Sequence, residues 1–202
     1  MQLYWAPRTR ASRAVWMLEE LALDYEIIPV EIRNRDRNEH SAFRQASPMG
    51  KVPALVDGET ALSESAAICL YLADRYASGR LAPAIDDASR GRFLYWMFFT
   101  PAVLEPAMAE KVHNIKPNRT AHGWGDFNSM INTLEDGLGD DQWLMGDEFT
   151  AADVMVGSSA AFLKMFDLLP LSVTIDAYID RCLARPAYRK ALAVDAEAMD
   201  EG

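Results

Sequence analysis

The sequence predicts two domains, an α/β domain at the start of the chain and an all-α domain after it. Short apolar runs bounded by turn residues, which are typical of strands, occur only within residues 1–78. Residues 79–87 are rich in small residues, proline and aspartate, and they are predicted to form a linker. Residues 88–202 show helical spacing of apolar residues and no further strand pattern.

The first domain is predicted to alternate strands and helices before it ends in a hairpin and a helix. Strands are expected at 2–6, 25–32 and 52–56, helices at 10–23, 42–46 and 65–76, and a polar connector at 34–39. Asp57-Gly58 is a strong two-residue hairpin turn that returns the chain into a further strand. This order predicts a mixed sheet with helices on its faces.

The second domain is predicted to contain only helices. They are expected at 89–112, 118–138, 150–166, 172–184 and 186–196. Pro101 and Pro106 fall inside the first of these, so that helix must kink or break. Thr150-Ala-Ala-Asp153 is a capping-box pattern with a structural role, and Asp153→Ala is expected to cost ~1 kcal/mol of stability.

Composition narrows the class of function. The chain has 202 residues, half of them apolar, with a net charge of −10 and a pI of about 4.8, which argues against a nucleic-acid partner. Residues 1–80 carry 10 basic and 11 acidic residues, whereas 81–202 carry 10 and 19, so a small anion meets less repulsion in the first part. An acidic solvated surface is the alternative explanation of this difference in charge.

The start of the chain lacks a signal-peptide pattern, and the longest uncharged run, 93–104, is too short to cross a bilayer. We therefore expect a soluble, cytoplasmic protein.

Neither cysteine nor histidine forms a metal-binding pattern. Cys69 and Cys182 lie in apolar helical patterns and are expected to be structural. His40, His113 and His122 are scattered at no ligand spacing, so no metal is expected.

The most informative stretch is Ser47-Pro-Met-Gly-Lys-Val-Pro-Ala-Leu-Val-Asp-Gly58, followed by Leu62-Ser-Glu-Ser-Ala-Ala-Ile68. It indicates a loop, a strand, a turn, a strand and a helix start. Pro53 opens a strand after a glycine loop, which makes it a candidate for a cis peptide bond. Ser63, Glu64 and Ser65 are residue types that cap helix N-termini.

This stretch, with the start of the chain, resembles the glutathione-binding half of a cytosolic glutathione transferase. The resemblance implies a thioredoxin-like first domain, glutathione as co-substrate and a two-fold homodimer. It also implies that Val52, before cis-Pro53, pairs by its backbone with the cysteinyl part of glutathione, and that Glu64 and Ser65 hold the γ-glutamyl end. Lys51 could pair with the glycyl carboxylate, or simply be solvated. Ser47 stands where the family usually has asparagine.

Glutathione chemistry depends on the thiolate, which is a minor form near a thiol pKa of ~8.5. Lowering that pKa by two units requires about 2.7 kcal/mol of preference for the anion. A helix N-terminus supplies ~0.3–1 kcal/mol and a hydrogen bond to a charged group ~1.5–3 kcal/mol, so both together suffice. The activating group should therefore lie at the start of a helix.

The turn between the first strand and the first helix offers that geometry. By resemblance, the serine of serine-type members falls on Thr9, and the cysteine of bacterial cysteine-type members falls on Arg10. We predict Thr9 as the thiolate donor, with Arg10 assisting and Ser12 as a further hydroxyl one turn later. The alternative is that Thr9 only caps the helix.

An aromatic cluster follows the linker. Trp96, Phe99 and Val103 are spaced to share one helix face, and the family resemblance implies that this face lines the electrophile pocket. Ordinary core and subunit contacts are the alternative.

The function that this resemblance implies is a glutathione transferase acting on a hydrophobic electrophile. A glutathione-dependent reductase or isomerase is an alternative, although no cysteine lies near Thr9. A non-catalytic binding or assembly module is a third possibility, because Thr9 and Arg10 depart from the family's own residues.

Overall fold

A computed structural model describes residues 1–32 and 41–200 of the chain. The predicted connector 34–39 and His40 therefore lie outside the described residues. The chain forms two compact units: residues 1–76 with 185–202, and residues 77–184. No described helix combines the length and the apolar character that crossing a membrane requires.

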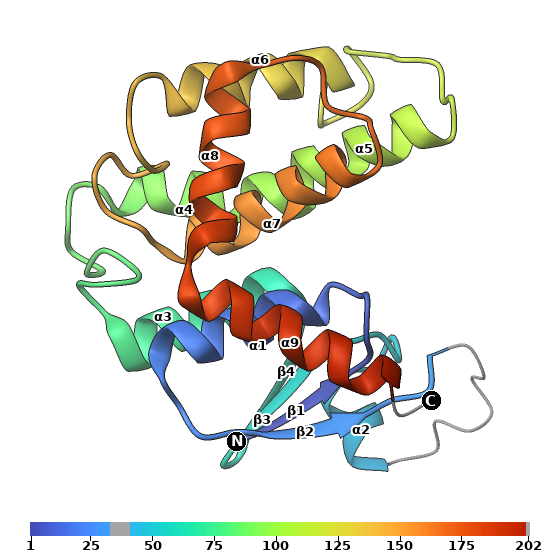
Figure 1. Cartoon of the computed structure of the whole chain (residues 1–202), viewed down its shortest axis with the longest axis vertical. Helices are drawn as coiled ribbons and strands as arrows, with labels where there is room; N and C mark the ends of the chain where they lie inside the picture. Colours follow the sequence, from blue (N-terminus) through green and yellow to red (C-terminus); the bar gives the residue numbers. More distant parts are fainter. Residues whose placement is uncertain (33–40, 201–202) are drawn as a thin grey trace. The chain divides into compact units, whose positions relative to one another are not determined.

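The first unit is built on a four-stranded mixed sheet in the order β2-β1-β3-β4 (Figure 1). The strands are β1 (Gln2–Trp5), β2 (Glu26–Pro29), β3 (Ala54–Asp57) and β4 (Thr60–Ser63). β1 is parallel to β2 and antiparallel to β3, which in turn is antiparallel to β4. The predicted mixed sheet and hairpin are confirmed, and β2 is shorter than the predicted strand 25–32.

Helices cover both faces of this sheet. The helices are α1 (Ala11–Leu21), α2 (Ser41–Ala46) and α3 (Ser65–Ala77), with α2 on the face opposite α1 and α3 (Figure 1). Tyr4 and Ala54 form a buried cluster with Phe43 of α2, and the rings of Tyr4 and Phe43 are 5.3 Å apart. Leu3 and Leu55 alternate with these residues along the strands, so they face the other side and are fully buried there.

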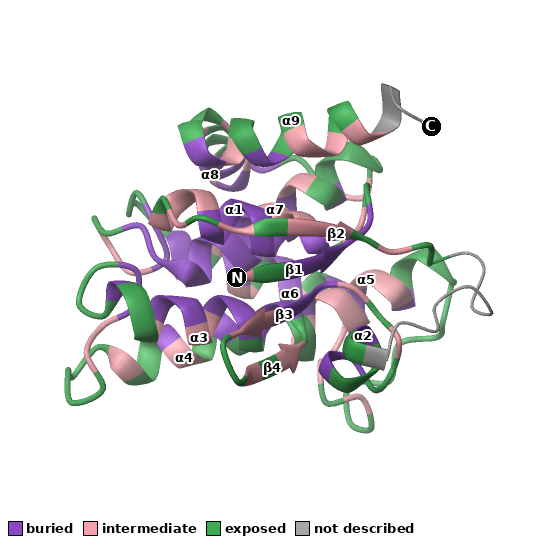
Figure 2. Ribbon diagram, turned by 90° about the horizontal axis from the view of Figure 1, so that it is seen from below, coloured by how far each residue is buried: buried purple, intermediate pink, exposed green. Residues whose placement is uncertain are grey.

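The helix α9 (Pro186–Asp200) packs antiparallel to α1 within the same unit. Just before α9, Arg185 forms two hydrogen bonds of 2.6 and 2.7 Å to Glu20, near the end of α1. Tyr188 contacts Trp16 edge-on at 4.8 Å. Asp195 reaches the backbone of Arg8, which precedes α1. Figure 2 shows β1 and α1 as mostly buried, whereas α9 alternates exposed with intermediate and buried residues.

The position of α9 differs from the predicted domain boundaries. All of 88–202 was predicted to lie in the helical domain, but residues 185–202 group with the unit that contains the sheet. The physical reason is the set of side-chain contacts with α1, which join residues 165 positions apart and leave no trace in local periodicity.

The second unit contains only helices among its described elements. They are α4 (Arg90–Phe99), the π-helical segment η2 (Thr100–Leu104), α5 (Glu105–Val112), α6 (Phe127–Leu138), α7 (Ala151–Met165) and α8 (Val173–Ala184). The helical run continues without a break from Arg90 to Val112, and the disturbance predicted at Pro101 takes the form of η2. Pro101 has no N–H to give to the carbonyl four residues back, and the Glu105 N–H bonds to the Thr100 carbonyl five residues back, as in a π-helix.

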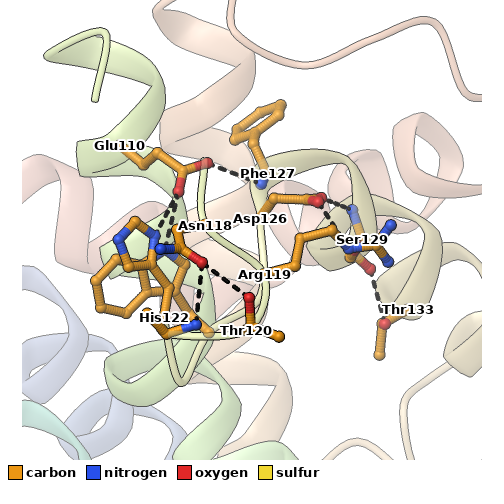
Figure 3. A network of polar contacts seen from close by, with 11 residues as sticks. Glu110, Asn118, Arg119, Thr120, His122, Asp126, Phe127, Ser129 and Thr133 are labelled. Carbon is orange, nitrogen blue, oxygen red and sulfur yellow. Dashed lines mark hydrogen bonds and ion pairs between the residues drawn. The ribbon is translucent and has the colours of Figure 1, made fainter. Parts of the chain in front are cut away.

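The predicted helix 118–138 begins nine residues later than expected. Residues 113–126 form an irregular segment that is fixed to α5 by the buried side chain of Glu110 (Figure 3). Glu110 accepts hydrogen bonds from Trp124 Nε1 at 3.2 Å and from the Phe127 N–H at 3.3 Å, and its Oε2 lies 3.2 Å from His122 Nδ1. Asp126 caps α6 by accepting from the Ser129 N–H at 2.7 Å. This cap is the reason that α6 starts at Phe127.

The predicted capping box of α7 is confirmed. Asp153 is fully buried and accepts hydrogen bonds from the N–H groups of Thr150 and Leu144, at 2.9 and 3.0 Å. The Tyr178 hydroxyl of α8 donates to the same carboxylate at 3.1 Å. Asp153 thus joins the start of α7, the preceding loop and α8 in one polar cluster.

Candidate functional site

Strand register brings three predicted site segments to one end of the sheet. β1 ends with Trp5, and Tyr4 of β1 pairs with Ala54, the first residue of the antiparallel strand β3. The turn that follows β1, residues 7–10, therefore lies beside the start of β3. Because Ala54 also pairs with Ser63, the end of β4 lies at the same place. Residues 7–10, 51–53 and 64–65 therefore meet at what we call the site end of the sheet.

The turn after β1 leads into the N-terminus of α1. Thr9 is half-buried, and its hydroxyl donates to the Ala6 carbonyl at 2.7 Å while it accepts from the Ala11 N–H at 3.2 Å. The second bond comes from the first residue of α1, whose N-cap position is Arg10 without a side-chain capping bond, so the Thr9 hydroxyl braces the turn just before the helix. Ser12 donates its hydroxyl proton to the Thr9 carbonyl at 3.1 Å. Both hydroxyls thus have backbone acceptors and would have to rotate to donate to a sulfur atom.

Two charged residues of this turn, Arg8 and Arg10, are exposed. Arg8 has a φ of 56°. That left-handed conformation costs a residue with a side chain roughly 1–2 kcal/mol, so surrounding contacts must hold it.

A buried serine holds the loop before β3. Ser47 accepts from the Lys51 N–H at 2.9 Å and donates to the Lys51 carbonyl at 2.7 Å, which fixes the backbone that enters Val52. The peptide bond between Val52 and Pro53 is cis, as the sequence analysis expected. The Lys51 side chain is exposed and Val52 is half-buried. Gly50 has a φ of 63°, a left-handed conformation that favours glycine at this turn.

The corner between β4 and α3 supplies the third segment. Glu64 is exposed and has a φ of 74°, and its carbonyl accepts the Ile68 N–H of the first turn of α3 at 2.9 Å. Ser65 is the first residue of α3 and is 7% exposed. Such a non-glycine left-handed residue at a helix start is a feature found at ligand-binding positions.

The electrostatics of the site end favour an anionic ligand. Both α1 and α3 begin there, and the N-terminus of a helix carries a partial positive charge and N–H groups without helical partners. The Lys51 side chain adds an exposed cation. The Glu64 carboxylate at the same corner is a negative group that can accept from a cationic part of a ligand.

The residues predicted for an electrophile pocket lie in the second unit. Trp96 and Phe99 contact each other with ring centroids 5.0 Å apart and are 3% and 2% exposed. Val103 is half-buried on η2, where the helical spacing used for the prediction no longer applies because the turn is wider. The structure therefore pairs Trp96 with Phe99 inside the helical unit, and the pocket role of all three residues stays a prediction.

Both cysteines are buried, as predicted. Cys69 is fully buried in α3, and burial raises the pKa of its thiol to about 12. Cys182 is equally buried in α8. A thiol with so high a pKa is un-ionised at neutral pH, so Cys69 is unsuited to be a nucleophile. Within the described ranges, no group of three His, Cys, Asp or Glu side chains is arranged to hold a metal ion.

Two contributors to the site were missed by the sequence reasoning. Ser47 was treated only as a departure from an expected asparagine, although its hydroxyl holds both backbone groups of Lys51. Asp195 accepts the Arg8 N–H from 187 positions away, and no local signal in the sequence could have identified it.

The chain combines a thioredoxin-like unit with an all-helical unit. Comparisons with known proteins find the same two domains. Residues 9–75 match the glutathione S-transferase N-terminal domain, and residues 117–189 match the glutathione S-transferase C-terminal domain. A glutathione S-transferase of Hypomyces subiculosus, hmp2, is 31% identical over 179 residues, which cover 82% of this chain and 84% of that protein.

A bacterial relative and a solved structure extend the comparison. The disulfide-bond oxidoreductase YfcG of Escherichia coli is 26% identical over 206 residues, covering 95% of this chain and 94% of that protein. A sphingomonad glutathione S-transferase, solved in complex with glutathione, superposes with a TM-score of 0.77 at 27% identity, covering 97% of this chain and 99% of that one. The chain belongs to the glutathione S-transferase family.

Proposed function

We propose that this protein is a glutathione transferase that binds glutathione at the site end of the sheet and activates its thiol. The observation that carries the proposal is the strand register, because it brings together residues 7–10, cis-Pro53 and its predecessor, and the Glu64/Ser65 corner. Two helix N-termini and Lys51 give that place a positive character. A glutathione complex of a relative with the same fold supports the choice of ligand.

In the proposed reaction, the bound thiol loses its proton to solvent, and the thiolate attacks an electrophilic carbon. A bond forms between sulfur and carbon, and a leaving group such as halide departs with its electron pair. The Thr9 hydroxyl would turn from the Ala6 carbonyl to donate to the sulfur, with the Arg10 charge and the N-terminus of α1 adding to the stabilisation. Val52 would pair with the cysteinyl backbone, Lys51 with the glycyl carboxylate, and Glu64 and Ser65 with the γ-glutamyl end.

The decisive variants are at Thr9. Thr9→Val keeps the shape and removes the hydroxyl, whereas Thr9→Ser keeps the hydroxyl. We expect Thr9→Val to raise the thiol pKa of bound glutathione by ~1–2 units, the size of one hydrogen bond to a charged group, and Thr9→Ser to stay near wild type. Arg10→Ala should raise the same pKa by a smaller amount. The measurement is thiolate absorbance of the complex against pH.

A second readout separates a structural role of Thr9 from activation. Thr9→Val removes the hydroxyl's bonds to the Ala6 carbonyl and from the Ala11 N–H, which lowers stability by ~1 kcal/mol whatever its chemical role. A stability loss without a change in the thiol pKa would therefore assign Thr9 to bracing the turn and assign thiolate stabilisation to another group.

A glutathione-dependent disulfide reductase is the second candidate, favoured by the similarity to the Escherichia coli oxidoreductase. Both cysteines of this chain are buried, so such an activity would have to run on glutathione thiols alone. Turnover of a generic aryl halide supports the transferase, and reduction of a small disulfide without aryl halide turnover supports the reductase. Retention on immobilised glutathione without either reaction supports a binding or assembly module, and no retention argues against all three.

The proposal extends to the substrate pocket and to assembly. Trp96, Phe99 and Val103 would contribute to the wall that receives the hydrophobic electrophile. The protein would be cytoplasmic and would work as a homodimer. Light scattering of the purified chain tests the homodimer, because it measures the mass of the particle in solution.

A further inference from the structure

A carboxyl of the last helix lies against the turn that carries Thr9. Trp5 is 2% exposed, and its indole nitrogen has no hydrogen-bond partner in the structure. The same holds for Oδ1 of Asp195, on α9. The other oxygen of this carboxyl, Oδ2, accepts the backbone N–H of Arg8 at 3.4 Å. A carboxyl from the last helix thus supports a residue adjacent to Thr9.

The conformation of the turn explains why such support matters. Arg8 has a φ of 56°, a conformation that is unfavourable for any residue with a Cβ. An acceptor fixed on a neighbouring helix holds the Arg8 N–H in that orientation. Because Thr9 follows directly, the orientation of Arg8 determines where the Thr9 hydroxyl and the N-terminus of α1 lie.

The placement of Asp195 on α9 is well determined by other contacts. Tyr188, Ala191 and Asp195 are spaced to share one face of the helix. Tyr188 contacts Trp16 of α1, and Ala191 is 2% exposed. Lys190 forms a further ion pair of 3.1 Å with Glu19. These contacts hold α9 along α1, so the position of Asp195 beside the turn is fixed by the packing of its helix.

We propose that Asp195 is a positioning residue of the glutathione site: its carboxyl holds the Arg8 N–H and so sets the geometry of the turn that presents Thr9 to the thiol. The thiol-related half of this inference rests on the proposed function, whereas the ordering of the turn does not. Burial raises the pKa of Asp195, while the Arg8 N–H and the Arg8 charge act in the opposite direction.

Three variants test the inference. Asp195→Ala removes the acceptor, and Asp195→Asn keeps an amide oxygen that can accept from Arg8. Lys190→Ala is the control on the same helix: it removes a largely exposed ion pair, which contributes little to holding α9, and does not touch the turn. In ligand-free protein, we expect Asp195→Ala to speed hydrogen exchange of the Arg8 amide about fivefold, the factor for one lost hydrogen bond. Asp195→Asn should restore slow exchange, and Lys190→Ala should leave it unchanged.

The functional readout is the thiol pKa of bound glutathione. Asp195→Ala should raise it by about half a unit or more, Asp195→Asn should return it to the wild-type value or below, and Lys190→Ala should not change it. The inference is overturned if Asp195→Ala changes neither exchange nor thiol pKa, or if Lys190→Ala reproduces its effects. If wild-type protein fails to bind glutathione, the proposed function is wrong, and so is the part of this inference that concerns the thiol. The exchange rates of the Arg8 amide still decide whether Asp195 orders the turn.

Discussion

Replacing Asp153 tests the energetics of the helical unit most directly. Asp153→Ala removes the acceptor of two buried backbone N–H groups, those of Leu144 and Thr150, and of the Tyr178 hydroxyl. The hydroxyl can turn to another acceptor, but the two N–H groups cannot. At ~1–3 kcal/mol for each buried donor left unpaired, and with part of this offset by removal of a buried charge, we expect a loss of about 3 kcal/mol. This exceeds the ~1 kcal/mol predicted from the capping pattern alone, because Asp153 also accepts from Leu144 and Tyr178.

The matched control is Asp126→Ala. Asp126 also accepts a backbone N–H at a helix start, but its side chain is 14% exposed, so water can replace the lost bond. Its loss should cost ~1 kcal/mol, the usual value for a helix cap. Urea unfolding of both variants, followed by tryptophan fluorescence, gives the comparison. If Asp153→Ala costs no more than Asp126→Ala, the reasoning from buried hydrogen bonds is wrong.

Asp153 also makes stability depend on pH. Burial raises its pKa from 3.8 to about 6 in the folded protein, against the opposing effect of its four hydrogen bonds. A raised folded pKa means that the folded state binds protons more tightly than the unfolded state. The contribution to stability is therefore complete below about pH 4 and is lost as pH rises through about 6, by ~3 kcal/mol in total. Compared with Asp153→Asn, which cannot titrate, wild type should gain stability between about pH 7 and pH 5. A difference that is flat or of opposite sign would contradict the raised pKa.

Two further variants examine packing and the irregular segment of the helical unit. An added Cβ at Gly157 would lie 2.5 Å from the Cys182 sulfur, so Gly157→Ala should lower stability by ~1–3 kcal/mol, and most of this loss should disappear in a Cys182→Ala background. Urea midpoints of the four proteins of this cycle measure the coupling, and independent effects would refute the contact. Glu110→Ala leaves the Phe127 N–H and Trp124 Nε1 without their acceptor, so stability should fall by ~2 kcal/mol or more. Trypsin should then cut the 113–126 segment faster, and unchanged cleavage would show that the segment is held by other contacts.

Local patterns predicted most elements of the fold. Short apolar runs bounded by turn residues and the Asp57-Gly58 turn identified the strands and the hairpin, because both depend on residues close in sequence. The capping box at Thr150 was also local and was confirmed, and the disturbance at Pro101 appeared as a π-helical turn rather than a break. The start of α6 was wrong by nine residues, because the Asp126 cap was not recognised and Glu110 holds the preceding segment out of the helix.

The site was predictable to the extent that its segments carry local signals. Pro53 after a glycine loop and the acid–serine pair at 64–65 were visible in the sequence. The backbone bonds of the Thr9 and Ser12 hydroxyls were not, since composition does not say which acceptor a hydroxyl takes. The contribution of α9 was also hidden, because its contacts with α1 and with Arg8 connect opposite ends of the chain.

The return of α9 to the first unit has a consequence for biosynthesis. The sheet leaves the ribosome first, but the helix that covers Trp16 and Glu20 follows only after the whole of residues 77–184 has been made. During that interval one side of α1 lacks its cover, whereas the helical unit can complete its own contacts from a continuous stretch. Closing so long a loop costs entropy and favours late docking. Nascent chains that stop before residue 185 should therefore expose an apolar flank that chaperones recognise.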